Sequence, residues 1–125
     1  SQKMEEGMSI LTEQEFEGDD LALQGYKHED KLSLFIDQFV EDITDRIFDL
    51  FPKGNDAKIA DAILELFRKR DNIDVFNKKA LYIYIREMVD VKTPKITKIA
   101  NVLYKLFKEK YMVYLEHGYY PSSKA

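Results

Sequence analysis

Residues 85–103, IREMVDVKTPKITKIANVL, decide how the second half of this chain folds. Apolar residues recur at three- and four-residue steps on both sides of a short central break, which is the pattern of two amphipathic helices. Within the break, Thr93 is a preferred N-cap residue, and Pro94 takes the first helical position, where its missing N–H costs nothing. The segment therefore predicts one helix over residues 78–90 and a long one from Thr93, joined by about three residues.

The spacing of this pair resembles a helix-turn-helix motif. When the motif is counted from Tyr82, its buried positions are all apolar: Ile85, Val89, Val91, Ile96 and Ile99. Such side chains wedge two helices at a steep angle and leave the second free to enter a major groove. The motif usually has a small residue where Arg86 stands and a left-handed glycine where Asp90 stands, so a plain helical hairpin stays open as the alternative.

In that geometry the second helix presents a polar, basic side to solvent. Lysine contacts phosphates or guanine, asparagine pairs with adenine, and threonine contacts a phosphate or a thymine methyl. Residues 77–111 hold nine basic and three acidic residues, which favours a polyanion as partner. The alternative is the solvated lysine face of an ordinary surface helix. The predicted DNA-binding residues are Lys92, Thr93, Lys95, Thr97, Lys98, Asn101 and Lys105.

Upstream, apolar periodicity predicts two more helices. The first covers about residues 29–51, carries acidic residues on its outer side and ends at Pro52 and Gly54. The second runs to about Arg70, with Asn55 or Asp56 as its N-cap. Its basic last turn suits the negative end of the helix dipole.

Further signals complete an all-α prediction. Asn77 is expected to cap the third helix, and Gly118 to end the fourth. Val75, Phe76 and Met88 are expected to face the core. With five Gly and three Pro in 125 residues, the chain has few turn signals for a β-sandwich. We expect a compact bundle of four main helices over residues 29–118, with the helix-turn-helix-like unit at 77–116 and a tail at 119–125.

Residues 1–28, here called the N-terminal arm, lack sustained periodicity and are rich in acids. Thr12 and Glu15 match a capping box for one short helical turn. We expect an acidic, partly flexible arm that orders on a partner. Its predicted partner-binding residues are Ile10, Leu11, Phe16, Leu21 and Leu23.

Charge is divided unevenly along the chain. Residues 1–57 hold 15 acidic and 5 basic residues, whereas residues 58–125 hold 8 acidic and 14 basic ones. The C-terminal part is therefore expected to face a polyanion or an acidic protein, unless the two halves simply attract each other. Because the whole chain is acidic, with a formal charge of −4, it is expected to bind DNA weakly by itself.

Several classes of function have no support in the sequence. The absence of Cys excludes disulfide frameworks, thiolate zinc sites and cysteine nucleophiles. His28 and His117 fit surface positions or a helix-dipole contact better than catalysis. No phosphate loop, calcium loop or serine nucleophile motif is present, so we expect a non-enzymatic protein without cofactor or metal. No apolar run approaches the roughly 18 residues of a membrane span, and no membrane partner is expected.

Three stretches also resemble a known family. FPKGNDAKIADAILELF (51–67), NKKALYIYIRE (77–87) and VKTPKITKIANVLYKLF (91–107) are similar to late-promoter transcription accessory proteins, or late-transcription coactivators, of tailed phages that infect marine cyanobacteria. The resemblance covers about residues 36–118. It implies RNA polymerase and a phage sigma-like factor as partners, with the sliding clamp as a further one, and a nucleoid-associated location in the host cytoplasm.

Two observations bear on the sliding clamp. The segment KLSLF (31–35) resembles the bacterial clamp-binding peptide, yet it is expected to lie inside a helix, with Leu32 and Phe35 in the core, whereas clamp peptides bind extended. The family's clamp-binding end is acidic and hydrophobic, whereas this chain ends in EHGYYPSSKA.

These observations together predict a transcription accessory factor that is not an enzyme. Its basic, helix-turn-helix-like face would contact promoter DNA or RNA polymerase while a larger assembly holds it. The alternative is a protein-interaction module or inhibitor whose acidic arm docks in a basic channel of a host enzyme.

Overall fold

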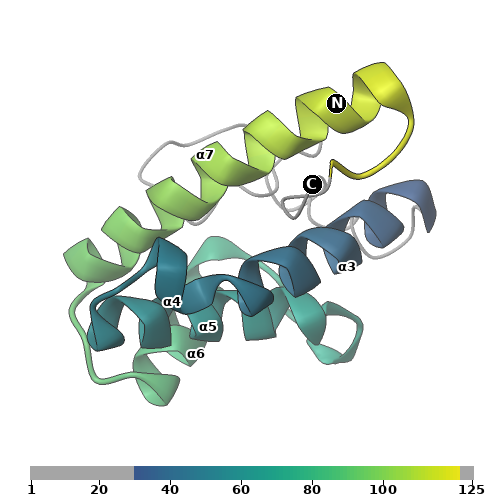
Figure 1. Cartoon of the computed structure of the whole chain (residues 1–125). Helices are drawn as coiled ribbons and strands as arrows, with labels where there is room; N and C mark the ends of the chain where they lie inside the picture. The colour runs from purple at the N-terminus through teal and green to yellow at the C-terminus, as the bar shows by residue number, and fades with distance from the viewer. Residues whose placement is uncertain (1–29, 122–125) are drawn as a thin grey trace.

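The computed structural model describes residues 30–121, and these form helices and turns without any β-strand. The predicted all-α fold with four main helices is confirmed. Figure 1 shows the elements in chain order, which are α3 (Asp30–Asp45), α4 (Ile47–Leu50), α5 (Gly54–Arg68), the 3₁₀ turn η1 (Arg70–Asn72), α6 (Lys78–Met88) and α7 (Thr93–His117).

The first predicted helix is two helices. Arg46 leaves helical geometry, with φ −112° and ψ 16°, and divides residues 29–51 into α3 and α4. Its side chain turns back along α3 and donates from Nε to Oδ1 of Asp42 at 2.9 Å. Beyond this bend, Ile47 and Phe51 are both buried against the rest of the core. The bend therefore adjusts the direction of the chain to the packing of α4, which hydrophobic periodicity alone does not reveal.

Helix starts follow the sequence signals in part. Asn77 is the N-cap of α6, where its Oδ1 accepts from the Ala80 N–H at 3.0 Å, as predicted. The predicted cap of α5 at Asn55 or Asp56 is wrong, because both residues lie inside its first turn and Lys53 is the N-cap. The Lys53 carbonyl accepts from the Ala57 N–H at 3.0 Å, so the helix already begins at Gly54.

The ends of α7 also agree with the predictions only in part. Lys92, with extended backbone at ψ 154°, is its N-cap, and Thr93 is its first helical residue instead of the predicted cap. Pro94 lies in the first turn, where no donor is needed. Gly118 ends the helix in the left-handed conformation at φ 78°, as predicted, and its N–H donates to the Tyr114 carbonyl at 2.7 Å.

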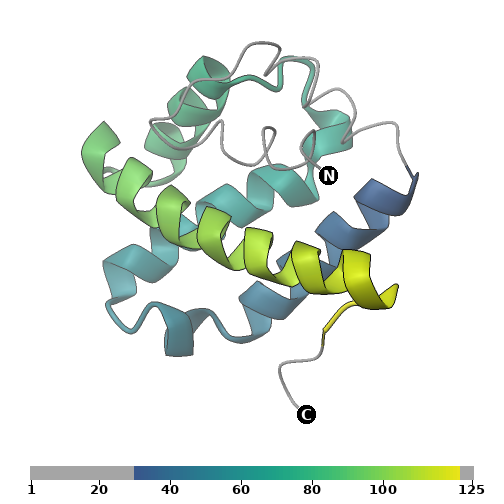
Figure 2. The same ribbon diagram turned by 90° about the horizontal axis from the view of Figure 1, so that it is seen from above.

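The core lies where α7 crosses α3 and α5 (Figure 2). Phe35 and Phe39 of α3 both meet Phe107 of α7 edge to face, with ring centroids 5.3 and 5.1 Å apart. Phe76 is buried, as predicted, and it packs edge to face on Phe67. Aromatic packing thus joins the first described helix to the last.

Two predicted core assignments need correction. Val75 and Met88 are about half exposed, because the connection before α6 and the end of α6 lie at the surface. Arg70, expected in the basic last turn of the second helix, lies in η1 and is 2% exposed. Its guanidinium donates to the carbonyls of Phe67 and Ser33, so it joins the end of α5 to α3.

Within residues 30–121, no helix is both long enough and apolar enough to cross a membrane.

Candidate nucleic-acid interface

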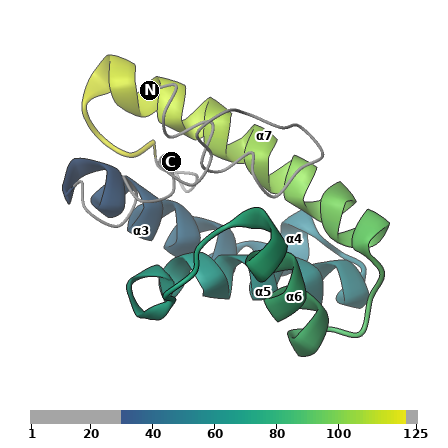
Figure 3. The ribbon, with the colours of Figure 1, turned by 180° about the vertical axis from the view of Figure 1, so that it is seen from behind.

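Helices α6 and α7 keep the buried pattern of a helix-turn-helix. Ile85, Ile96 and Ile99 are fully or almost fully buried. Val89 and Val91, in the connection, are partly buried and pack on the same core. The two helices diverge steeply from their connection in Figures 1 and 3 and do not run alongside each other. The apolar wedge between them is therefore where the sequence predicted it.

The connection itself differs from the motif. Asp90 does not take the left-handed conformation, since no non-glycine residue of the described range has a positive φ. Arg86, where the motif has a small residue, lies at the surface and donates from Nη1 to Thr93 Oγ1 at 2.8 Å. A hydrogen bond between two polar side chains therefore stands where the motif usually has a small residue.

Most of the predicted DNA-binding side chains are exposed. The exposed ones are Lys92, Thr93, Lys98, Asn101 and Lys105. The last three share one side of α7, because they are separated by three and four residues. Lys92 and Thr93 stand at the start of the helix, where free N–H groups favour an anion. These positions remain available to a partner within the described part of the molecule.

Thr97 is a correction to this set. It is 6% exposed, because α6 covers this side of α7. Its hydroxyl lies 3.0 Å from that of Tyr82, and it also donates to the Thr93 carbonyl at 3.2 Å. Thr97 therefore holds the two helices together and is not available to DNA.

Lys95 is half-buried and paired. Its Nζ lies 2.9 Å from Oδ1 of Asp56, in the first turn of α5. The hydrogen bond from Lys95 holds the pKa of Asp56 below its usual value, and the charges of Lys53 and Lys98 lower that pKa further. The starts of α5 and α7 therefore meet at one carboxylate that is surrounded by lysines.

The exposed side of α7 is longer than the predicted set. It continues past Lys105 with Lys108, Met112 and Leu115, at the same helical spacing. We call this surface the α7 outer face and define it as Lys98, Asn101, Val102, Lys105, Lys108, Met112 and Leu115. The repeat of three and four residues could have located Lys108, whereas the pairing of Lys95 with Asp56 depends on the tertiary fold.

The other predicted site residues lie outside the described range or away from the α7 outer face. The arm residues Ile10, Leu11, Phe16, Leu21 and Leu23 lie outside the described range, as do the Thr12–Glu15 capping box and His28. His117 is exposed at the last position of α7, in the place expected for a helix-dipole contact. Leu32 and Phe35 of the clamp-like segment are buried in α3, so this segment is not presented as an extended peptide.

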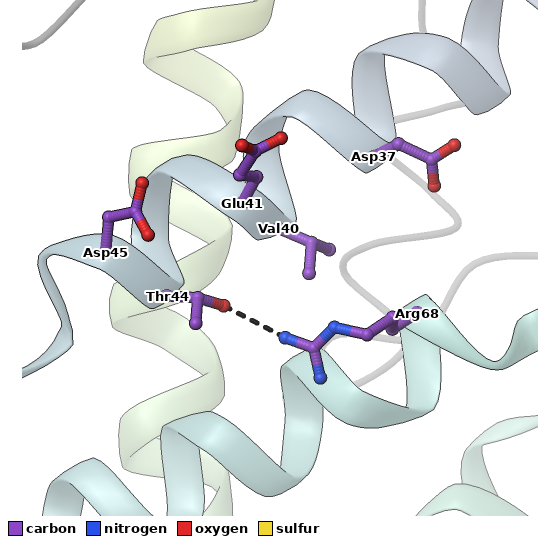
Figure 4. A pocket seen from close by; sticks show the side chains of 6 residues that line it. All are labelled: Asp37, Val40, Glu41, Thr44, Asp45 and Arg68. Carbon is purple, nitrogen blue, oxygen red and sulfur yellow. Dashed lines mark hydrogen bonds between the residues drawn. The ribbon is translucent and has the colours of Figure 1, made fainter.

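A hollow between α3 and α5 is acidic on one side (Figure 4). Asp37, Glu41 and Asp45 line it from α3 at four-residue steps, while Arg68 of α5 closes it by donating to Thr44 Oγ1 at 3.0 Å. Within the described residues, no group of three or more His, Cys, Asp or Glu side chains has the arrangement of a metal site. The hollow offers negative charge to a basic group but presents no nucleophile beside a base.

The second hollow lies between the end of α5, η1 and α6 and has a volume of about 400 Å³. Its apolar lining comes from Leu66, Ile73, Tyr84 and Met88.

Searches of protein-family models, curated proteins and solved structures found no match to this chain.

Proposed function

We propose that this protein is a transcription accessory factor that contacts promoter DNA through the α7 outer face while RNA polymerase holds it. The observation that carries the proposal is the exposure of Lys98, Asn101 and Lys105 on one side of a helix that α6 supports through a buried apolar wedge. Two lysines placed this way suit phosphates, and the asparagine between them suits an adenine edge.

The arrangement of charge supports an accessory role more than autonomous binding. Acidic residues line the outer side of α3, whereas the lysines lie along α7. Phosphate attraction thus comes from one surface of a chain whose net charge is −4, and electrostatic affinity is correspondingly small. A larger assembly that fixes the protein near the promoter would supply the missing affinity by raising the effective concentration.

The test measures DNA binding with and without RNA polymerase. Fluorescence anisotropy of a labelled promoter duplex should give weak binding by the protein alone and clearly tighter retention when polymerase is present. Lys98→Ala and Lys105→Ala should each lower the dependence of log K on log salt by about one unit. Lys69→Ala is the matched control, because Lys69 is an exposed lysine at the C-terminal end of α5, away from the α7 outer face.

Two results would contradict the proposal. Tight DNA binding by the protein alone at physiological salt would indicate an autonomous repressor. Retention by polymerase that is indifferent to Lys98, Asn101 and Lys105 would show that this face does not contact the promoter.

A second candidate is a protein-interaction module or inhibitor whose acidic arm occupies a basic channel of a host enzyme. The observation in its favour is the exposure of large apolar side chains that DNA does not need, above all Phe48 of α4, which is 72% exposed. In this case, exchanging the exposed Lys98 and Lys105 for Glu should leave partner binding intact. Deletion of residues 1–28 should abolish that binding.

A further inference from the structure

The α7 outer face combines positive charge with apolar surface. Met112 is 58% exposed and Leu115 is 59% exposed, and three exposed lysines precede them along the helix. Glu109 and Glu116 lie on the same side and reduce the charge at its C-terminal end. A surface that is basic toward one end and apolar toward the other fits a peptide in which acidic and apolar residues occupy separate segments.

We propose that the occupant of this face is the N-terminal arm of the same chain. Residues 1–28 contain seven acidic residues and two lysines, and five of the acids lie close together at Glu13, Glu15, Glu17, Asp19 and Asp20. Leu21 and Leu23 follow on the side nearer to α3. The leucines therefore match the apolar end of the face, and the acids match its lysines.

The fold brings the arm to the correct end of α7. Phe35, near the start of α3, lies 5.1 Å from the ring of Tyr111 and 5.0 Å from that of Tyr114, measured between centroids. The chain before residue 30 therefore joins the domain near the C-terminal end of α7, the end that carries Met112 and Leu115 on its exposed side. Helix α7 has 25 residues and a length of about 37 Å, and the 10–17 residues between the acids and residue 30 span up to roughly 33–56 Å when extended. The acidic segment can thus reach Lys105 and Lys98.

Covalent connection makes such docking favourable even when each contact is weak. A segment tethered beside its surface has an effective concentration in the millimolar range, so ion pairs and a few apolar contacts suffice. Salt should weaken the docking, because the lysines are exposed and their charges are screened.

The docked arm would cover Lys98, Asn101 and Lys105. This consequence, unlike the docking itself, rests on the proposed function: an acidic segment on the α7 outer face competes with DNA until another partner removes it. The competition makes the DNA contact conditional on assembly.

Docking is tested by paramagnetic broadening in the full chain, without DNA. Since the chain contains no cysteine, Glu109→Cys carries a single nitroxide label at an exposed position beside the α7 outer face. At low salt, this label should broaden the amide signals of residues 13–23 strongly, and about 0.5 M salt should restore them. The matched control is Glu87→Cys, an exposed glutamate of α6, whose label should broaden those signals less than the label at position 109.

Two outcomes would overturn the docking proposal. One is equal broadening, or none, from the two label positions. The other is broadening that appears when isotope-labelled protein without nitroxide is mixed with nitroxide-labelled protein, since this would identify the arm of a second copy as the occupant.

Competition with DNA is tested by neutralising the acidic segment. A variant with all five acids of residues 13–20 changed to Gln or Asn should bind duplex DNA on the order of tenfold more tightly at low salt. The control changes the net charge equally at exposed acids of the folded domain: Glu41, Asp45, Asp49, Asp61 and Asp71. Equal gains in both variants would refute the competition. Failure of every variant to bind promoter DNA even when RNA polymerase is present, with broadening still observed, would refute the proposed function and leave the docking intact.

Discussion

Thr97 and Tyr82 face each other where α6 covers the second turn of α7. Both side chains are 6% exposed, and their hydroxyl oxygens are 3.0 Å apart. A buried hydroxyl needs a partner, and each of these residues supplies the other with one. Helical spacing alone places Thr97 close to Lys98 and Asn101. The burial of its side chain could therefore not be predicted without knowing where α6 lies.

The first prediction separates this structural role from a role in DNA binding. Thr97→Val removes the hydroxyl at nearly constant volume and leaves Tyr82 without this partner, so it should lower the free energy of unfolding by about 1–2 kcal/mol. Urea denaturation followed by circular dichroism measures the loss. The double variant Tyr82→Phe, Thr97→Val should recover part of the loss, because neither hydroxyl then stays buried without the other. DNA affinity that fell more for Thr97→Val than for Lys98→Ala would contradict the assignment.

The second prediction concerns the hydrogen bond from Tyr120 to Asp42. The Tyr120 hydroxyl donates to Asp42 Oδ2 at 2.6 Å and ties the segment after α7 to α3. Because the acceptor is charged, Tyr120→Phe should cost about 1.5–3 kcal/mol of unfolding free energy. Tyr119→Phe is the matched control. Tyr119 is the neighbouring residue and is 61% exposed, so this change should alter stability by less than about 0.5 kcal/mol.

The effect of Tyr120→Phe should depend on pH. Burial raises the pKa of Asp42, but the hydrogen bonds from Tyr120 and Arg46 outweigh it, so the pKa lies below the ordinary 3.8. Stability from this carboxylate is fully present above that value and is lost as the pH falls through the lower folded pKa. The difference between wild type and variant should therefore be constant near pH 7 and shrink below pH 3.8. A difference that stays constant as the pH falls, down to the acid unfolding of the domain, would show that the ionised carboxylate is not the acceptor that matters.

At the scale of elements, two glycines provide the third prediction. Gly118 ends α7 with φ 78°, whereas Gly54 starts α5 without a positive φ, and an added Cβ would contact nothing within 4 Å at either position. Any difference must therefore come from the backbone. Gly118→Ala should cost about 1–2 kcal/mol, because an L-residue is strained in the left-handed region. Gly54→Ala should stabilise by about 0.4–1 kcal/mol, because it lowers the entropy of the unfolded chain. Thermal unfolding of both variants gives the comparison, and a loss of stability in both would contradict it.

Local signals account for much of what could be predicted about the helices. The 3.6-residue periodicity located the buried sides of α3, α5 and α7, and Asn77 and Gly118 marked two helix ends, because capping is a short-range interaction. The bend at Arg46 and the burial of Arg70 were missed. Both depend on partners that the sequence does not bring together: Ile47 packs in the core, and Arg70 bonds to Ser33, 37 residues earlier. The candidate site divides in the same way, with Lys98 and Lys105 found by spacing and the Lys95–Asp56 pair found only in the fold.

At the scale of the whole molecule, both ends of the described chain meet at one aromatic cluster. Phe35 of α3 is fully buried and lies 5.0–5.4 Å, centroid to centroid, from four rings: Phe107, Tyr111, Tyr114 and Tyr120. These contacts close the bundle, because more than 70 residues separate Phe35 from each of these partners. They also hold the C-terminal part of α7 beside the start of α3, where the N-terminal arm joins the domain.

The fourth prediction tests whether this cluster governs the stability of the whole domain. Phe35→Ala opens a cavity among rings that cannot all move inward, and it should cost about 3–5 kcal/mol of unfolding free energy. The neighbouring Leu34 is 57% exposed, so Leu34→Ala should change stability by less than about 0.5 kcal/mol. Phe35→Leu keeps most of the apolar volume, so its loss of unfolding free energy should lie between those of Phe35→Ala and Leu34→Ala. It allows the comparison if the alanine variant is too unstable to fold.

Urea denaturation followed by both far-ultraviolet and aromatic circular dichroism should give coincident transitions, because one core joins α3, α5 and α7. An aromatic transition that precedes the loss of helix would instead show that the α3–α7 contact opens as a separate unit, and the N-terminal arm would then be tethered to a movable part of the molecule.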